Sequence, residues 1–425
     1  MLVVHCRRVM HSDFAGKVAE TYLTRVSVMG LALFATVIVS RLLGPEGRGY
    51  YAVAVATGAL GVQFATVGMH TANSYFAAKE PQSLPHLMGN TLLLSFAVGS
   101  AVILLLAGLL HVWPRLLDLH GALLVFALLW IPIGLAYMLL QSLLLGIQDI
   151  RGYNLAEFGS KVLTVVFLGL LVVTRRIGVV YFLASALLAI AIACAWECVR
   201  LNRQFPGKIG FSKSVFYDGI SYAFKAYWAA TFCFLVLRAD LFMVQHMLGP
   251  VQAGYYSIAS TMADYVSVLA AVIGTILFPK LSALTDLRKK FELTKRATLG
   301  TAVILVPVLA ITSLLAKPAV QLLFGSAFLP ASWCFVLLMP GMLFLGIHAV
   351  SVQFLNSIGY PIIVVVIWGV GSLFNIVVNL WAIPRYGIAG ASVVSSISYF
   401  LVFLFVLGVI YREGRNLQSL VYQNI

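Results

Sequence analysis

Two segments far apart in the chain have almost the same sequence: residues 43–51 read LGPEGRGYY and residues 248–256 read LGPVQAGYY. In both, Leu-Gly-Pro is followed at the same spacing by Gly-Tyr-Tyr, and long apolar runs lie before and after the segment. A connection that recurs in this way is typical of an internal duplication. The pair therefore predicts two related halves, each with this connection between its first and second apolar runs.

Two weaker matches fall in register with the first. Arg176-Ile177-Gly178 and Arg385-Tyr386-Gly387 each open the sixth apolar run of a half. Pro132 and Pro340 each lie in the middle of a fourth run. One such match could arise by chance, but matches that keep the same order along both halves indicate that the whole half is duplicated.

The composition places these apolar runs in a membrane. Of the 425 residues, 61% are hydrophobic and only 10% are charged, whereas soluble domains carry about 25% charged residues. Runs of about 20 apolar residues are long enough to cross a bilayer as helices, and they lack the alternation of a barrel strand. A helix also pairs its own backbone polar groups, as hydrocarbon requires. We therefore expect an all-α integral membrane protein.

The apolar runs define about twelve transmembrane helices of the length that a bilayer requires. The expected spans are residues 18–42, 49–77, 87–112, 121–147, 154–174, 178–200, 215–246, 252–279, 295–316, 330–356, 361–383 and 388–411. An even number of spans per half gives both halves the same orientation, so we expect parallel six-helix repeats around a central cavity. The expected parts are a cytoplasmic N-terminus at 1–17, an N-terminal lobe at 18–203, a cytoplasmic linker at 204–214, a C-terminal lobe at 215–411 and a cytoplasmic tail at 412–425.

The net charge of the chain is +14, and most of its basic residues lie between the apolar runs. This placement indicates membrane orientation and contact with anionic lipids, and it argues against a nucleic-acid partner. Lys and Arg are concentrated in alternate connections, for example 200–213 and 280–296. These connections are expected on the cytoplasmic side, which also makes both termini cytoplasmic.

Basic residues also fall inside the expected spans. Arg25, Lys161 and Lys225 lie at a similar depth, about 12–15 Å from the cytoplasmic ends at 1.5 Å per residue, and Arg238 lies deeper. A charge at mid-bilayer costs about 3 kcal/mol or more, so each should face a cavity or a partner. Because Arg and Lys bind phosphate oxygens strongly, we expect a cationic cavity for an anionic substrate. The polar residues expected to line it are Thr21, Gln63, His70 and Thr261.

Two acidic residues of the first half have basic neighbours in the sequence. Glu157 precedes Lys161 by four residues, an order that favours an ion pair on a helix. Glu197 lies beside Arg200 near the cytoplasmic end of its span, and we expect its side chain to extend to the surface. An ion pair or a surface position is the simpler interpretation of these acids.

Polar residues of the second half suggest two other roles. Asp240 and Asp264 are the candidates for coupling transport to a Na⁺ or H⁺ gradient, because acidic residues within membrane segments commonly mark ion pathways. Asn375 and Asn379 share one helix face, and we interpret them as residues that hydrogen-bond to neighbouring helices.

The sequence carries no enzyme signature. Its eight histidines form no HExxH pair, and Gly44, Gly47 and Gly49 lack the Lys-Ser/Thr that completes a phosphate-binding loop. We therefore expect no catalytic residue, no metal and no cofactor.

Three segments carry a resemblance to a known family: Ser40–Tyr50, Leu237–Asp240 with the LGPxxxGYY motif after it, and Leu277–Lys280. They resemble the bacterial polysaccharide transporters, which are the O-antigen and exopolysaccharide repeat-unit flippases of the multidrug/oligosaccharidyl-lipid/polysaccharide exporter superfamily. The resemblance covers the whole chain. It implies a V-shaped cavity between two lobes, with Arg238 as a cavity cation.

The resemblance also implies a function. The substrate would be an anionic undecaprenyl-diphosphate-linked oligosaccharide, moved from the cytoplasmic to the periplasmic leaflet of the bacterial inner membrane by alternating access. Polysaccharide polymerases would then be partners. A cation-coupled multidrug exporter of the same superfamily is the second hypothesis, and a membrane-embedded enzyme of polysaccharide assembly is the third.

Overall fold

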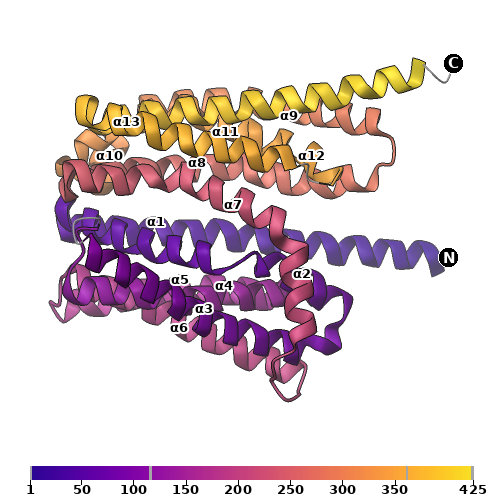
Figure 1. The fold of residues 1–425 in the computed structure, drawn as a ribbon, viewed down its shortest axis with the longest axis horizontal. Coiled ribbons are helices and arrows are strands. Elements are labelled where there is room, and N and C mark those ends of the chain that lie inside the picture. Colours follow the sequence, from indigo (N-terminus) through magenta and orange to yellow (C-terminus); the bar gives the residue numbers. More distant parts are fainter. Residues whose placement is uncertain (1, 114–116, 360–361, 423–425) are drawn as a thin grey trace. The chain divides into compact units, whose positions relative to one another are not determined.

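The computed structural model describes residues 2–113, 117–359 and 362–422, and it describes side chains within these ranges except in 2–22, 213–226 and 414–422. Every regular element in these ranges is a helix. The first half contains α1 (Leu2–Ala65), α2 (Met69–Lys79), the short η1 (Pro81–Ser83), α3 (Leu84–Val112), α4 (Gly121–Gly146), α5 (Ile150–Val173) and α6 (Val179–Gln204). The second contains α7 (Lys213–Leu248), α8 (Pro250–Ala283), α9 (Leu287–Leu314), α10 (Ala316–Phe324), η2 (Ser326–Phe328), α11 (Leu329–Ser351), α12 (Gln353–Ser357) and α13 (Ile362–Tyr422) (Figure 1).

The structure confirms an all-α membrane fold with twelve spans. Ten helices in the described part of the chain are long and apolar enough to cross a bilayer. Two of them, α1 and α13, each contain one residue with a non-helical backbone: Gly44, with φ 65°, and Gly387, with φ 62°. Each kink divides its helix into two spans, so the ten helices supply the predicted twelve.

The Leu-Gly-Pro motif explains where two of the spans begin. Gly44 and Gly249 have φ of 65° and 85°, in a region that glycine enters without the steric cost that a Cβ brings. A proline follows each glycine at the start of the next helical segment, where its missing N–H has no partner to lose. The motif therefore ends one span and starts the next within three residues.

The chain folds into two compact units. Unit 1 comprises residues 1–43, 54–114 and 119–224, and unit 2 comprises residues 44–53, 115–118 and 225–425. The boundary after residue 224 lies inside α7. Residues 44–53, which carry most of the first LGPxxxGYY motif, belong to unit 2 although the rest of α1 belongs to unit 1.

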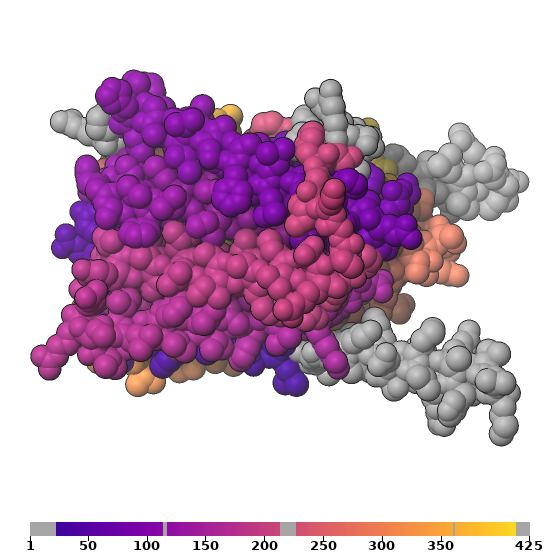
Figure 2. All heavy atoms as spheres, turned by 90° about the horizontal axis from the view of Figure 1, so that it is seen from below, coloured from indigo at the N-terminus to yellow at the C-terminus, as the bar shows by residue number. Residues whose placement is uncertain are grey.

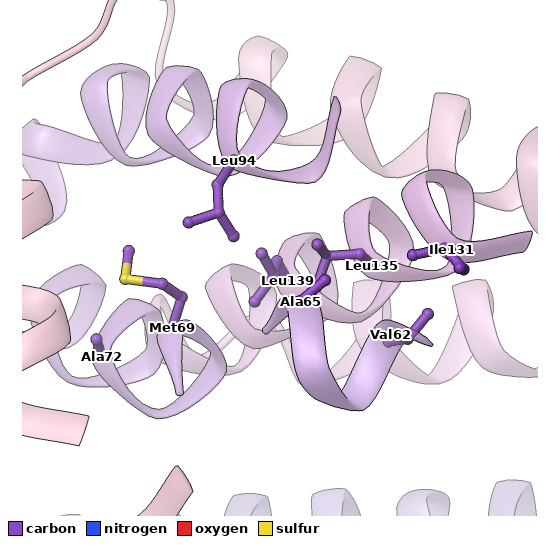
Figure 3. Packing of buried hydrophobic residues seen from close by; sticks show 8 residues of the cluster. All are labelled: Val62, Ala65, Met69, Ala72, Leu94, Ile131, Leu135 and Leu139. Carbon is purple, nitrogen blue, oxygen red and sulfur yellow. The ribbon is translucent and has the colours of Figure 1, made fainter. Parts of the chain in front are cut away.

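Figure 3 shows one cluster of buried apolar side chains in unit 1. The buried side chains are Val62 and Ala65 of α1, Met69 and Ala72 of α2, Leu94 of α3, and Ile131, Leu135 and Leu139 of α4. Lipid tails are as apolar as these side chains, so van der Waals packing holds the helices together more than the hydrophobic effect does. Gly61 shows how close the packing is, because a Cβ added there would overlap the side chain of Ile131.

The outer surface of the helices is apolar. Leu104 and Leu105 of α3 are 72% and 71% exposed, and Val173 of α5 is 81% exposed. Figure 2 shows one face of unit 1 in purple and magenta. Exposed apolar side chains in this number suit a surface in contact with lipid.

One predicted span ends earlier than expected. The expected span at 49–77 is broken: α1 ends at Ala65 and α2 begins at Met69. Between them Val67 and Gly68 have φ of 45° and 80°, and the turn is closed by a 2.8 Å hydrogen bond from the Met69 N–H to the Thr66 carbonyl. Positive φ at two successive residues is incompatible with a continuous right-handed helix, and the apolar composition of this stretch conceals the break.

The two LGPxxxGYY segments pack against each other inside unit 2. A Cβ added to Gly49 would overlap the carbonyl oxygen of Pro250, and a Cβ added to Gly254 would overlap the carbonyl oxygen of Pro45. The contact is thus reciprocal, with the glycine of each copy lying against the proline backbone of the other. The shared spacing of the two motifs has a direct physical reason, because only glycine leaves room for this approach.

We predict that Gly254→Ala destabilises the protein although it replaces a helical glycine. The new methyl group meets backbone, which moves less easily than a side chain, and overpacking of this kind costs about 1–3 kcal/mol. Gly300→Ala in α9 is the matched control, because nothing lies within 4 Å of a Cβ at that position. Thermal unfolding in detergent should give a lower Tm for Gly254→Ala and an equal or higher Tm for Gly300→Ala. Equal values for both variants would contradict the contact.

Candidate functional site

A buried carboxylate organises the polar part of unit 2. Asp240 of α7 is 2% exposed. It accepts hydrogen bonds from the Ser395 hydroxyl of α13 at 2.8 Å, from the Leu241 N–H at 2.8 Å and from the Tyr256 hydroxyl of α8. Several donors around one carboxylate compensate for the loss of its hydration. Tyr256 is the last residue of the second LGPxxxGYY motif, so the motif supplies one of these donors.

An ion pair lies next to this carboxylate. Arg238, two residues before Asp240, forms a 2.6 Å salt bridge with Asp264 of α8, and the two side chains are 33% and 42% exposed. Tyr399 of α13 is 4% exposed and interacts electrostatically with Asp240, Asp264 and Arg238. The structure therefore joins Arg238, Asp240 and Asp264, three of the predicted site residues, in one cluster.

The asparagines predicted to form hydrogen bonds extend the same cluster. The Asn375 side-chain amide donates to the Ser398 hydroxyl at 3.1 Å, and the Asn379 amide donates to the Asn375 side-chain oxygen at 3.1 Å. Ser398 lies one helical turn from Ser395. Asn375 and Ser398 are on opposite sides of the Gly387 kink, so this hydrogen bond holds the two arms of α13 together.

A second cluster lies in unit 1. Lys161 of α5 is half-buried and interacts with Glu157 one turn away. Arg25 of α1 is exposed, and it interacts with Tyr153 of α5, which also interacts with Glu157. Arg25 and Lys161, which were predicted at a similar depth, thus both interact electrostatically with residues 153–157 of α5. The side chain of Lys225, the third predicted member, lies outside the described residues.

The expected lining residues have mixed surroundings. Gln63 and His70 are half-buried, and a His70 ring nitrogen lies 3.1 Å from the Thr71 hydroxyl. The Thr261 hydroxyl donates to the Ser257 carbonyl of its own helix at 2.6 Å. The side chain of Thr21 is outside the described residues.

Arg48 is a polar residue that the sequence interpretation did not single out. It is 6% exposed, its Nε donates to the Ser257 hydroxyl at 3.2 Å, and its guanidinium lies 5.6 Å from the centre of the Tyr51 ring. The sequence feature that could have drawn attention to Arg48 is its position inside the first motif, between Gly44 and Gly49. Arg48 therefore links the first motif to α8, just after the second motif.

The expected position of Glu197 was wrong. Arg200 forms a two-point salt bridge with Asp149, with N–O distances of 2.5 and 2.9 Å. Its partner is therefore Asp149 and not Glu197, which lies on the same helix. The Arg200 guanidinium holds the pKa of Asp149 below its usual value, and Asp149 also accepts from the Gly152 N–H at the start of α5. Glu197 itself is 0% exposed and does not extend to the surface.

Comparison with known proteins gives one family match. A family model described as polysaccharide biosynthesis protein matches residues 38–333. An uncharacterised membrane protein of Methanocaldococcus jannaschii is 23% identical over an alignment of 292 residues that covers 65% of this chain. The chain spans 58% of the length of that relative.

Solved structures of transporters share the fold. The lipid II flippase MurJ in an inward closed conformation matches with a TM-score of 0.66 and 16% identity, over 92% of this chain and 87% of that chain. An inward-facing multidrug resistance transporter of the MATE family matches with a TM-score of 0.73 and 14% identity, over 93% and 99%. A transporter of the MOP superfamily from Pyrococcus furiosus, described as having a binding pocket of reverse polarity, matches with a TM-score of 0.61 and 15% identity. The match covers 93% of this chain and 96% of that chain. At these identities the likeness is one of fold.

We predict that Tyr256→Phe destabilises unit 2 more than Tyr255→Phe does. Tyr256→Phe removes a donor from a buried carboxylate, and hydrogen bonds to charged groups contribute about 1.5–3 kcal/mol. Tyr255 is the matched control, since it is the adjacent tyrosine of the same motif and packs edge-on against Phe328. Thermal unfolding of the two variants measures the difference. A Tyr256→Phe variant as stable as Tyr255→Phe would show that Asp240 does not depend on this hydroxyl.

Proposed function

The chain belongs to the polysaccharide biosynthesis protein family, and on that premise we propose that it is a flippase for a polyprenyl-diphosphate-linked oligosaccharide. The family, the multi-pass membrane fold and the likeness to flippases and exporters support a transport protein. In this proposal the substrate is an undecaprenyl-diphosphate repeat unit. It moves across the bacterial inner membrane, both termini are cytoplasmic, and polysaccharide polymerases use the product.

The observation that carries the proposal is the presence of basic side chains within membrane-spanning helices. Arg25 is exposed, Lys161 is half-buried and Arg238 is 33% exposed. Such side chains are costly in hydrocarbon and are retained where they face a partner or a polar path. A diphosphate offers several charged oxygens, with which guanidinium and ammonium groups form strong charge-assisted hydrogen bonds.

The organisation into two units supports alternating access. Each unit has its own packed helices, and the boundary between the units in the second half of the chain lies inside α7. Transporters built from parallel repeats work largely by rocking one bundle against the other around a central site. We propose that Arg25, Lys161, Lys225 and Arg238 line that site, together with Thr21, Gln63, His70 and Thr261.

Coupling to an ion gradient is part of the proposal. Asp240, Tyr256 and Ser395 place oxygen atoms of three helices within hydrogen-bonding distance of one another. Hard cations prefer oxygen ligands of this kind, and a proton would bind Asp240 directly. Asp264 is the weaker candidate because its carboxylate already pairs with Arg238.

A multidrug exporter is the second candidate function, and the buried Asp240 is the observation that favours it. Exporters of lipophilic cations would be expected to gather acidic groups along the path. Here Arg238 and Asp264 neutralise each other, Lys161 is offset by Glu157, and the exposed Arg25 adds positive charge in unit 1. The charge distribution therefore suits an anionic substrate better.

We predict that the purified protein is stabilised by an undecaprenyl-diphosphate sugar and not by a lipophilic cation. A ligand that binds the folded state raises its stability by about 2.7 kcal/mol at 100 times its Kd, and thermal unfolding measures this effect. Arg25→Gln and the double variant Arg238→Gln/Asp264→Asn should lose the stabilisation. The double change removes both members of the ion pair, so it leaves neither charge unpaired.

Arg176→Gln and Arg385→Gln are the controls for this experiment. Both residues lie in connections expected on the outer side, so the diphosphate lipid should stabilise these variants as it does the natural protein. Stabilisation by the lipophilic cation alone would instead support the multidrug exporter.

A further inference from the structure

Glu197 is a buried carboxyl group that unit 1 leaves without a hydrogen bond. It lies on α6, is 0% exposed, and neither of its side-chain oxygens has a hydrogen-bond partner among the described residues. An ionised carboxylate in this position would lose its hydration and gain nothing in return. Groups in such surroundings take up a proton and become neutral.

The residues around Glu197 are tyrosines, cysteines and apolar side chains. From α4, Tyr137 interacts with it, and from α5, Tyr153 does so. Cys194 and Cys198, on the same helix as Glu197, also interact with it electrostatically. From α3, Leu87 and Met88 contribute to an apolar cluster that also contacts Tyr153, Cys194 and Cys198.

The basic residues of the region are engaged with other groups. Lys161 interacts with Glu157, Arg25 acts on Tyr153, and Arg200 is held by Asp149. One Glu157 oxygen is itself buried without a hydrogen-bond partner. Around Glu197 the described residues therefore supply phenol, thiol and apolar groups and no direct counter-charge.

The chemistry of this site suits a proton better than a metal ion or an anion. The described part of the chain contains no group of three His, Cys, Asp or Glu residues that could hold a metal ion. An anion would be repelled by an ionised Glu157 or Glu197. A proton needs one carboxyl oxygen, where it forms an O–H bond and removes the buried charge.

We propose that Glu197 is a proton-binding residue of unit 1 whose protonation is coupled to the transport cycle. The group holds its proton while α4, α5 and α6 are packed as they are here. It releases the proton to water when a rearrangement wets the site. The protonation is a property of the folded chain, and its coupling to transport rests on the proposed function.

Infrared spectroscopy tests the protonation. The full-length protein in detergent should show the C=O band of a protonated carboxyl group at neutral pH, and that band should decrease as the pH is raised. Glu197→Gln should lose the band, because glutamine is a neutral group of nearly the same shape. Glu292→Gln, at an exposed position of α9, is the control and should keep it.

Either of two results would overturn the assignment: no such band at neutral pH, or a band that persists unchanged in Glu197→Gln. A second measurement on the natural protein removes any dependence on the folding of the variant. A hydrophobic carbodiimide reacts with protonated carboxyl groups in apolar surroundings, and peptide mapping should locate the label on Glu197 at neutral pH. An unlabelled Glu197 would contradict the proposal.

Transport in vesicles tests the coupling. A pH gradient should accelerate movement of the diphosphate lipid by the natural protein. The Glu197→Gln variant should move the lipid at the same rate with and without the gradient. A response retained in full by Glu197→Gln would refute the coupling. Absence of movement by every variant, together with absence of thermal stabilisation, would count against the flippase function, while the infrared band would still decide the protonation.

Discussion

The reciprocal contact of the two LGPxxxGYY segments is the constraint on which much of unit 2 depends. Gly49 lies against the Pro250 backbone and Gly254 lies against the Pro45 backbone, so the first half of the chain contributes residues 44–53 to the unit formed by the second. The second segment, residues 248–256, begins α8 at Pro250 and thereby places Tyr256 where it donates to Asp240. The LGPxxxGYY motif thus determines both the close approach of the two backbone segments and the position of a donor to Asp240.

Burial of ionisable groups is handled differently in the two units. In unit 2 each acid of the cluster has partners: Asp264 has Arg238, and Asp240 has two hydroxyl groups and a backbone N–H. In unit 1 Glu197 has none among the described residues, and it is best stabilised as the neutral acid. The difference gives two kinds of titratable site in one transporter fold, one built around a hydrogen-bonded carboxylate and one around a solitary carboxyl.

The sequence predicted the features that depend on local pattern. Length of apolar runs, repeated motifs and even span number led to an all-α fold of twelve spans in two halves. The break at Val67–Gly68 was missed because a turn of three residues leaves the apolar composition of a span unchanged. Glu197 was misplaced because its proximity to Arg200 in the sequence suggested a shared surface position. The actual partner of Arg200 is Asp149, 51 residues away, and no spacing rule reveals a contact of that range. The same holds for Asp240 and Ser395, which are 155 residues apart.

Movement of the glycolipid itself is the most direct test of the transport function. The full-length chain would be reconstituted into vesicles that contain a polyprenyl-diphosphate oligosaccharide, and a glycosidase added outside would report how much of the sugar becomes accessible over time. We predict that the accessible fraction rises above that of protein-free vesicles, and that an uncharged glycolipid of the same length is not moved. Equal accessibility with and without the protein, in vesicles where the same protein moves a lipophilic cation, would contradict it.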